Sequence, residues 1–196
     1  MSPVSIDLWK AFDSVNRDAL WRIIGLHGVP PKLINVMSEL FSGTESAVRC
    51  GGTISDLFQV ITGVRYGCVL APTLFSACMN WILGRMSERS SCGASFGNVK
   101  ISDLDIAEYA AIFAETLDIL MGALEVLNEE SGPLRLWVFW VKTKIQAFTG
   151  ILDAAVLSVL VCGEDVEVTE RFTYLCSDIH VPACCEQEVS GHLRWA

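Results

Sequence analysis

The chain has 196 residues, of which 52% are hydrophobic and 19% are charged, and this composition excludes an intrinsically disordered protein. The formal net charge is −9, from 23 acidic and 14 basic residues, which argues against a large cationic surface for nucleic acid. The length suits one domain with a substantial core, and no internal repeat or low-complexity linker divides it.

The eight cysteines are scattered without CxxC spacing, so buried free thiols are expected rather than zinc ligands. The first residues lack the basic region and long apolar run of a signal peptide. No apolar run reaches the length of about eighteen residues that a membrane span needs. We therefore expect an intracellular protein, cytoplasmic or nuclear, with no membrane partner; its oligomeric state stays open.

The first half of the chain predicts a strand, two helices and a hairpin. Residues 4–8 are an apolar run that carries Asp7, and Asn16 can cap a helix that ends near Gly28. The pair Pro30-Pro31 predicts the start of a second helix. Its apolar spacing predicts burial of Leu33, Ile34, Met37, Leu40 and Phe41. A glycine turn at 51–53 predicts a hairpin between residues 45–50 and 56–61.

The second half begins with a glycine-punctuated loop that leads into a long buried helix, roughly residues 73–87. Residues 102–115 predict two short strands joined by a tight acidic turn at Glu108 and Tyr109. Thr116 can cap a further helix, and residues 134–141 and 145–149 predict strands. Short β-prone runs follow as far as residue 176.

Five short motifs follow one another along the chain. They are Ile6-Asp7-Leu8 with Ala11-Phe12-Asp13-Ser14-Val15, Gly63-Val64-Arg65, Gly67-Cys68-Val69-Leu70-Ala71-Pro72, Lys142-Thr143-Lys144, and Phe172-Thr173-Tyr174-Leu175. In this order they closely resemble the reverse transcriptase domain of non-LTR (LINE-type) retrotransposons, over about residues 4–179. The resemblance implies an α/β (α+β) polymerase palm, a small, mostly antiparallel sheet backed by helices on one face. It places this palm at residues 1–180, with fingers and thumb largely missing. The last residues show no clear periodicity, and 181–196 are expected to form an unstructured tail.

The same resemblance implies an RNA-directed DNA polymerase that uses an RNA template, a DNA primer and two Mg²⁺ ions. In that family one Asp of the first motif and the Asp pair of an Ala-Asp-Asp hairpin hold the ions, because Mg²⁺ requires several oxygen ligands. Asp7 and Glu108 are then the implied catalytic and metal-binding residues, and Tyr109 occupies the remaining catalytic position. Phe12 corresponds to the residue beneath the sugar of the incoming nucleotide.

Further nucleotide-binding positions follow from the resemblance. Arg65, Tyr66 and Gly67 correspond to a loop that supports the nucleotide and the template. Lys142 and Lys144 are both candidates for the lysine that donates a proton to pyrophosphate, and a solvated turn is equally compatible with either. For Asp7 the structural alternative is a carboxylate bonded to backbone amides. The tryptophans are expected in the core, although Trp9 adjoins the site.

Three positions depart from the family pattern. Glu108-Tyr109 replaces the Asp pair, Tyr66 replaces a Gln, and Cys176 replaces a Gly. Glu108 moves its oxygens by about 1 Å, a misplacement that can cost roughly a hundredfold in rate, and Tyr109 removes a carboxylate. Asp103 and Asp105 are expected to lie outside the metal site.

These departures predict little or no polymerase activity, doubtful Mg²⁺ binding, and weak or absent binding of template and primer. The alternatives are a non-catalytic remnant that binds nucleic acid or protein, or a chain that scarcely folds.

Overall fold

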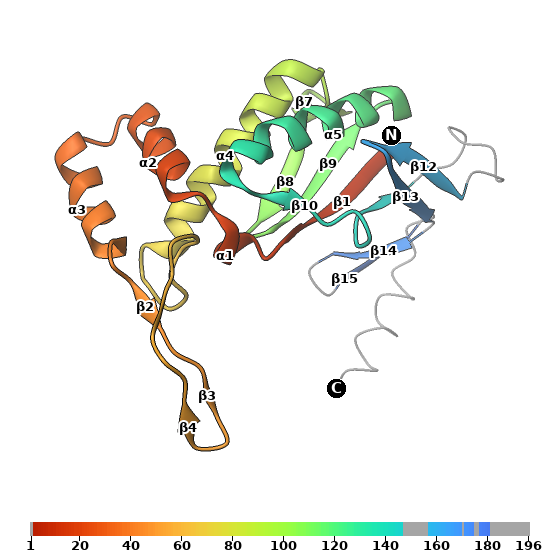
Figure 1. Ribbon diagram of the computed structural model, residues 1–196. Helices are drawn as coiled ribbons and strands as arrows, with labels where there is room; N and C mark the ends of the chain where they lie inside the picture. Colours follow the sequence, from red (N-terminus) through yellow and green to blue (C-terminus); the bar gives the residue numbers. More distant parts are fainter. Residues whose placement is uncertain (1, 147–156, 170, 175–176, 181–196) are drawn as a thin grey trace.

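The computed structural model describes residues 2–146, 157–169, 171–174 and 177–180 (Figure 1). Within these residues a seven-stranded sheet has the order β12-β13-β11-β1-β9-β8, and β10 also pairs with β1. All neighbouring strands are antiparallel except β11 and β13, which are parallel. The strands are β1 (Ser2–Trp9), β8 (Asp103–Ile106), β9 (Tyr109–Ala114), β10 (Trp137–Val138), β11 (Lys144–Gln146), β12 (Ser158–Val161) and β13 (Glu164–Thr169).

Two helices, α4 (Ala71–Ser90) and α5 (Leu117–Ser131), lie side by side over one face of this sheet (Figure 1). They enclose the core with the strands, because alternate residues of β1 and β9 point toward them. Fully buried side chains include Val4, Ile6, Phe75, Ile112, Leu120 and Leu124. The predicted α/β fold class, a largely antiparallel sheet backed by helices, is confirmed.

The helix caps form as the sequence predicts. The Asn16 side chain accepts hydrogen bonds from the N–H groups of Asp18 and Ala19 at the start of α2 (Arg17–Leu26). At the start of α5 the Thr116 hydroxyl accepts one from the Ile119 N–H. Each cap satisfies backbone donors that a helix leaves unpaired at its N-terminus. The short helix α1 (Ala11–Ser14) precedes α2.

Helix α3 (Pro31–Phe41) begins at the predicted proline, but its burial differs from the prediction. Phe41 is buried and Ile34 and Met37 are partly buried, whereas Leu33 and Leu40 are exposed. The reason is that α3 packs chiefly against α2 and does not lie on the sheet. Its apolar stripe therefore covers a smaller surface than the spacing suggests.

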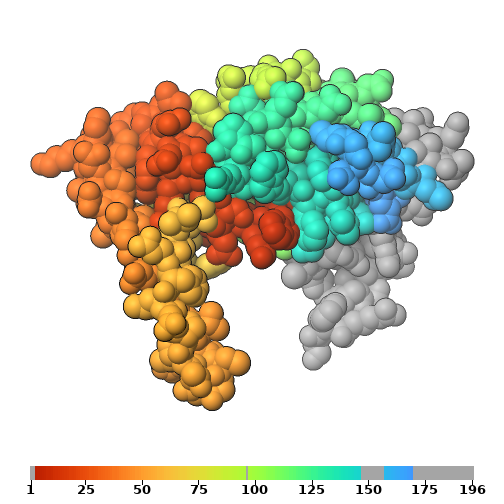
Figure 2. Space-filling model, viewed as in Figure 1, coloured from red at the N-terminus to blue at the C-terminus, as the bar shows by residue number. Residues whose placement is uncertain are grey.

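A long hairpin follows α3 and projects away from the body of the molecule (Figure 2). Near its base β2 (Glu45–Ser46) pairs with β5 (Phe58–Gln59), and near its tip β3 (Arg49–Cys50) pairs with β4 (Thr53–Ile54). The Arg17 guanidinium holds the base by donating to the carbonyl groups of Phe41, Val60, Thr62 and Gly63. The predicted hairpin is confirmed.

The strand predicted at residues 134–141 is much shorter than expected. A 3-10 turn, η1 (Gly132–Leu134), precedes the two-residue strand β10, and a turn at residues 139–143 then separates β10 from β11. Leu8 pairs with Val138, while Val4 pairs with Ile145, so β10 and β11 share the same edge of β1. The turn therefore interrupts what the sequence presents as a continuous β run.

Two small hairpins complete the described structure. One joins β6 (Ala94–Phe96) to β7 (Val99–Ile101), and the other joins β14 (Arg171–Tyr174) to β15 (Ser177–His180). The predicted tail at 181–196 and the end of the predicted strand 145–149 lie outside the described residues. Within the described part of the chain, no helix combines the length and the apolar character that a membrane crossing requires.

Candidate active site

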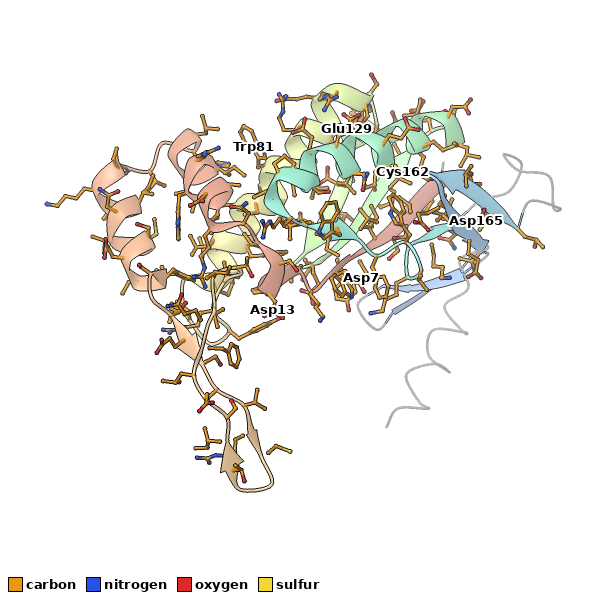
Figure 3. All side chains as sticks on the ribbon, in the orientation of Figure 1. Asp7, Asp13, Trp81, Glu129, Cys162 and Asp165 are labelled. Carbon is orange, nitrogen blue, oxygen red and sulfur yellow. The ribbon has the colours of Figure 1, made fainter. Side chains whose placement is uncertain are left out.

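The site begins on β1, where Asp7 faces away from the helices. Val4, Ile6 and Leu8 are buried in the core, so the side chains of Ser5 and Asp7 point to the opposite, open face of the sheet. Figure 3 labels Asp7 on this strand and Asp13 on α1. The register of β1 with β9 places Tyr109 directly opposite Asp7. Residues paired in this way have Cβ atoms roughly 5 Å apart on one face.

The turn between β8 and β9 brings Glu108 to the same place. Ile106 pairs with Tyr109, so Ala107 and Glu108 form the two-residue loop of this hairpin. Ala107 has a φ of 54°, the left-handed conformation that such tight turns use. The Glu108 carbonyl also accepts a hydrogen bond from the Leu8 N–H at 3.3 Å. The predicted acidic hairpin is confirmed, although Tyr109 begins the second strand and lies outside the loop.

A pocket of about 310 Å³ opens over this part of the sheet. Six residues that the sequence places at the site line it: Asp7, Phe12, Tyr66, Glu108, Tyr109 and Lys142. Three others, Arg65, Gly67 and Lys144, are absent from its lining. The remaining lining residues are Leu8, Trp9, Lys10, Ala11 and Phe139.

Lys142 is the lysine that reaches Asp7. Its Nζ donates a hydrogen bond to Asp7 Oδ2 at 2.9 Å, and this bond with the charge of Asp7 raises the pKa of the ammonium. The turn at residues 139–143 positions it, because the Phe139 N–H donates to the Asp7 carbonyl at 2.8 Å. The described partner of the Asp7 carboxylate is thus a lysine side chain, whereas the structural alternative expected backbone amides. Lys144 instead forms an ion pair with Glu167 across β11 and β13.

A stack of three aromatic rings lies at the other side of the pocket, and two of them, Phe12 and Tyr66, line it. Phe12 stacks on the buried Phe75, with ring centroids 4.5 Å apart, and on Tyr66, with centroids 5.3 Å apart. Tyr66 is 68% exposed, but desolvation by its neighbours raises the pKa of its hydroxyl, and the carboxylates of Asp13 and Glu108 raise it further. Tyr66 thus stacks on Phe12, the residue expected to lie beneath the sugar of a nucleotide.

The sequence did not single out Lys10 and Phe139, and it assigned Trp9 to the core. Trp9 is instead 47% exposed, and the Lys10 ammonium lies 4.8 Å from the centroid of its ring. Lys10 adopts a left-handed φ of 47° where β1 turns into α1, which directs both residues to the pocket rim. The signal for Trp9 and Lys10 was their place within the Asp7 motif. No comparable signal marked Phe139.

Asp103 and Asp105 lie on the other face of the sheet. Asp103 pairs laterally with Ile112, and Asp105 pairs with Ala110, whose side chains belong to the core. Partial burial raises the pKa of Asp105, and the neighbouring Asp103 charge raises it further. Their carboxylates are thus separated from Asp7 by the sheet, in agreement with the expectation that they lie outside the metal site.

The resemblance to reverse transcriptases implies bound divalent metal ions, which need several oxygen ligands from the pocket. Asp7 is paired with Lys142, Tyr109 supplies no carboxylate, and Glu108 is the other acidic residue lining the pocket. In the described ranges no group of three or more His, Cys, Asp or Glu side chains is arranged to hold a metal. Since Mg²⁺ requires several oxygen ligands close together, these residues do not fit a two-metal centre.

Known sequences and structures resemble this chain along most of its length. The family described as reverse transcriptase (RNA-dependent DNA polymerase) matches residues 2–177. The Pol polyprotein of the retrotransposable element R2DM of Drosophila melanogaster is 28% identical over 112 residues, which are 57% of this chain and 10% of that protein. An R2 polyprotein of Popillia japonica is 28% identical over 119 residues, 60% of this chain and 17% of that protein.

Solved structures agree in fold. Apo telomerase from Candida tropicalis, truncated of its C-terminal domain, superposes with a TM-score of 0.63 at 16% identity, over 91% of this chain and 34% of that one. Telomerase from the same organism with a fragment of telomeric RNA has the same TM-score at 14% identity, over 91% of this chain and 28% of that one. The chain spans only a small part of each relative. The family match over residues 2–177 and the R2 relatives agree with this fold, and we conclude that the chain belongs to the reverse transcriptase (RNA-dependent DNA polymerase) family, as a domain of the LINE type.

Proposed function

We propose that this chain is a palm derived from a retrotransposon RNA-directed DNA polymerase and that it has little or no polymerase activity. The observation that carries the proposal is the pairing of Tyr109 with Asp7. In the ancestral chemistry, two Mg²⁺ ions would require a second carboxylate at this point. A phenol there cannot replace an anionic bridging ligand, and Glu108 has a longer side chain than the Asp it replaces.

Much of the nucleotide pocket is nevertheless retained. Phe12 rests on Phe75 at the base, and Tyr66 covers it. RNA template and DNA primer are the partners that the family implies, and their binding is weakened by the net charge of −9. The pocket thus persists, whereas the metal ligands do not.

Primer extension on an RNA template with Mg²⁺ or Mn²⁺ tests this proposal directly. The wild-type chain is expected to add no detectable nucleotides. The double variant E108D/Y109D restores the Asp pair, whose two carboxylates together outweigh the Lys142 charge beside Asp7, and it is expected to gain activity. Asp7→Asn in that background is expected to abolish the gain. Robust incorporation by the wild type that Asp7→Asn abolishes would refute the proposed inactivity.

A second candidate function is nucleic-acid binding without catalysis. Trp9 pairs directly with Trp137 at the junction of β1 and β10, and their residues are 47% and 50% exposed. Both follow the open-face alternation of Asp7, so they form an aromatic pair beside the pocket. Exposed aromatic rings are stacking platforms for single-stranded bases, worth about 1–3 kcal/mol per base.

Titration of a single-stranded RNA oligonucleotide, followed by tryptophan fluorescence at several salt concentrations, tests this candidate. Binding that weakens with salt and is lost in Trp137→Ala would support it. Trp81→Phe is a suitable control, because Trp81 lies on α4 beside His27, away from the pocket. No salt-dependent quenching in the wild type would exclude this function.

A further inference from the structure

The carboxylate of Asp7 is unusually enclosed for a group on an open sheet face. Its side chain is 10% exposed, and among the described residues the side-chain donor that pairs with it is the Lys142 ammonium at 2.9 Å. An ionised carboxylate at this depth is costly unless a cation compensates it. Lys142 supplies that cation from within the chain.

The position of Lys142 is determined by its own turn. The Lys142 N–H donates to the Phe139 carbonyl at 2.9 Å, and the buried Thr143 donates to the same carbonyl through its N–H at 3.0 Å and its hydroxyl at 3.1 Å. The turn is tied to Asp7 by the bond from the Phe139 N–H. The ammonium also lies 5.1 Å from the Phe139 ring centroid, a cation–π distance.

The acidic and basic side chains that line the pocket are equal in number. Asp7 and Glu108 contribute two carboxylates to its lining, and Lys10 and Lys142 contribute two ammonium groups. A divalent cation entering beside Asp7 would meet the Lys142 charge and would find Tyr109 where a second anionic ligand is needed.

We propose that Lys142 is the resident counter-ion of Asp7 and that its ammonium keeps divalent cations out of the pocket. This inference concerns the same pocket as the proposed function and rests on it. The proposed function attributes the loss of metal binding to the carboxylate missing at Tyr109. The inference adds a second cause, the positive charge of Lys142.

Calorimetric titration of Mn²⁺ into three proteins tests the inference in the absence of nucleotide and template. Lys142→Met is expected to bind Mn²⁺ about tenfold more tightly than the wild type, because Asp7 is then left without its cation. Lys144→Met is the matched control: it removes the same charge two residues away, from a lysine paired with Glu167. It is expected to behave like the wild type. The double variant D7N/K142M is expected to lose the gain.

An equal Mn²⁺ affinity in Lys142→Met and Lys144→Met would overturn the inference. Thermal unfolding followed by circular dichroism confirms that each variant folds. If Lys142→Met fails to fold, the wild type and Asp7→Asn are melted with increasing Mn²⁺: no metal-dependent rise in Tm is expected, and a rise that Asp7→Asn removes would overturn the inference. Polymerisation by the wild type would refute the proposed inactivity without deciding this nucleotide-free titration.

Discussion

Gly63 lies against the backbone of Phe12 so closely that a Cβ atom at this position would be 2.6 Å from the Phe12 carbonyl oxygen. The Asp13 carbonyl oxygen would be equally close. The same contact is made by hydrogen bonds: the Gly63 N–H donates to the Val15 carbonyl at 2.8 Å, and the Val64 N–H donates to the Phe12 carbonyl at 2.7 Å. Gly63 therefore joins the loop that carries Tyr66 to α1, the short helix that carries Phe12.

Gly63→Ala is accordingly expected to destabilise the fold by about 3 kcal/mol, from overpacking together with a strained left-handed φ. Gly67→Ala is the matched control, because Gly67 has the same φ of +78° but nothing within 4 Å of the added Cβ. It is expected to cost about 1–2 kcal/mol, the conformational strain alone. Urea unfolding of both variants measures the difference. Equal losses would show that the contact with Phe12 is unimportant.

Arg17 is expected to be a major stabilising residue, because its guanidinium joins α2 to the base of the projecting hairpin. Its Nε and Nη atoms donate to four backbone carbonyls at 2.8–3.1 Å. Arg17→Ala is expected to cost about 3 kcal/mol in urea unfolding, since charged hydrogen bonds to partly buried carbonyls are lost. Arg17→Lys is expected to recover little of it, because an ammonium lacks the planar fork of donors.

Arg22→Ala serves as the control for this experiment, since Arg22 is exposed on the same helix. Its unfolding free energy is expected to remain within about 0.5 kcal/mol of the wild type. A loss in Arg17→Ala no larger than that of Arg22→Ala would contradict the assigned role.

Cys78 is expected to resist alkylation in the folded protein. Burial under the sheet raises the pKa of its thiol to about 12, so the reactive thiolate is scarce at pH 8. Cys50, which is exposed at the hairpin tip, is expected to react readily. Iodoacetamide labelling at pH 8 with peptide mass mapping compares the two, and labelling in urea should modify both. Equal native rates would contradict the burial of Cys78.

Asp105→Asn is expected to stabilise the protein at neutral pH. Because the folded-state pKa of Asp105 is raised above its ordinary value of 3.8, its ionised form disfavours folding above the folded-state pKa. Removing the charge therefore raises the free energy of unfolding at pH 7. This gain shrinks as the pH falls through the folded-state pKa and is lost below 3.8. Urea unfolding at both ends of this range measures it.

Asp56→Asn is the control, because Asp56 is exposed in the hairpin arm. It is expected to change stability little at either pH. A gain in Asp105→Asn that persists at acid pH would mean that its carboxylate charge is not the cause.

Local features were predictable from the sequence because they depend on neighbouring residues. Asn16 and Thr116 cap helices, Pro31 begins one, and the glycine pair at 51–52 turns the hairpin. Burial was less predictable: Leu33 and Trp9 have apolar side chains at suggestive positions, but the surface available to cover them is a property of the whole fold. The strand at 134–141 was overestimated because a turn stabilised by the buried Thr143 interrupts its β-prone residues.

The amino-acid sequence by itself determined which chemical groups the site can have: a carboxylate at Asp7, a longer one at Glu108, and a phenol at Tyr109. Only the tertiary structure decided how they meet. Asp7 and Lys142 are separated by 135 positions, and the turn beside β10, not any local pattern, selects Lys142 over Lys144. Strand register likewise sends Asp105 to the face opposite Asp7. Such pairings depend on backbone hydrogen bonds between distant segments, which local side-chain patterns do not specify.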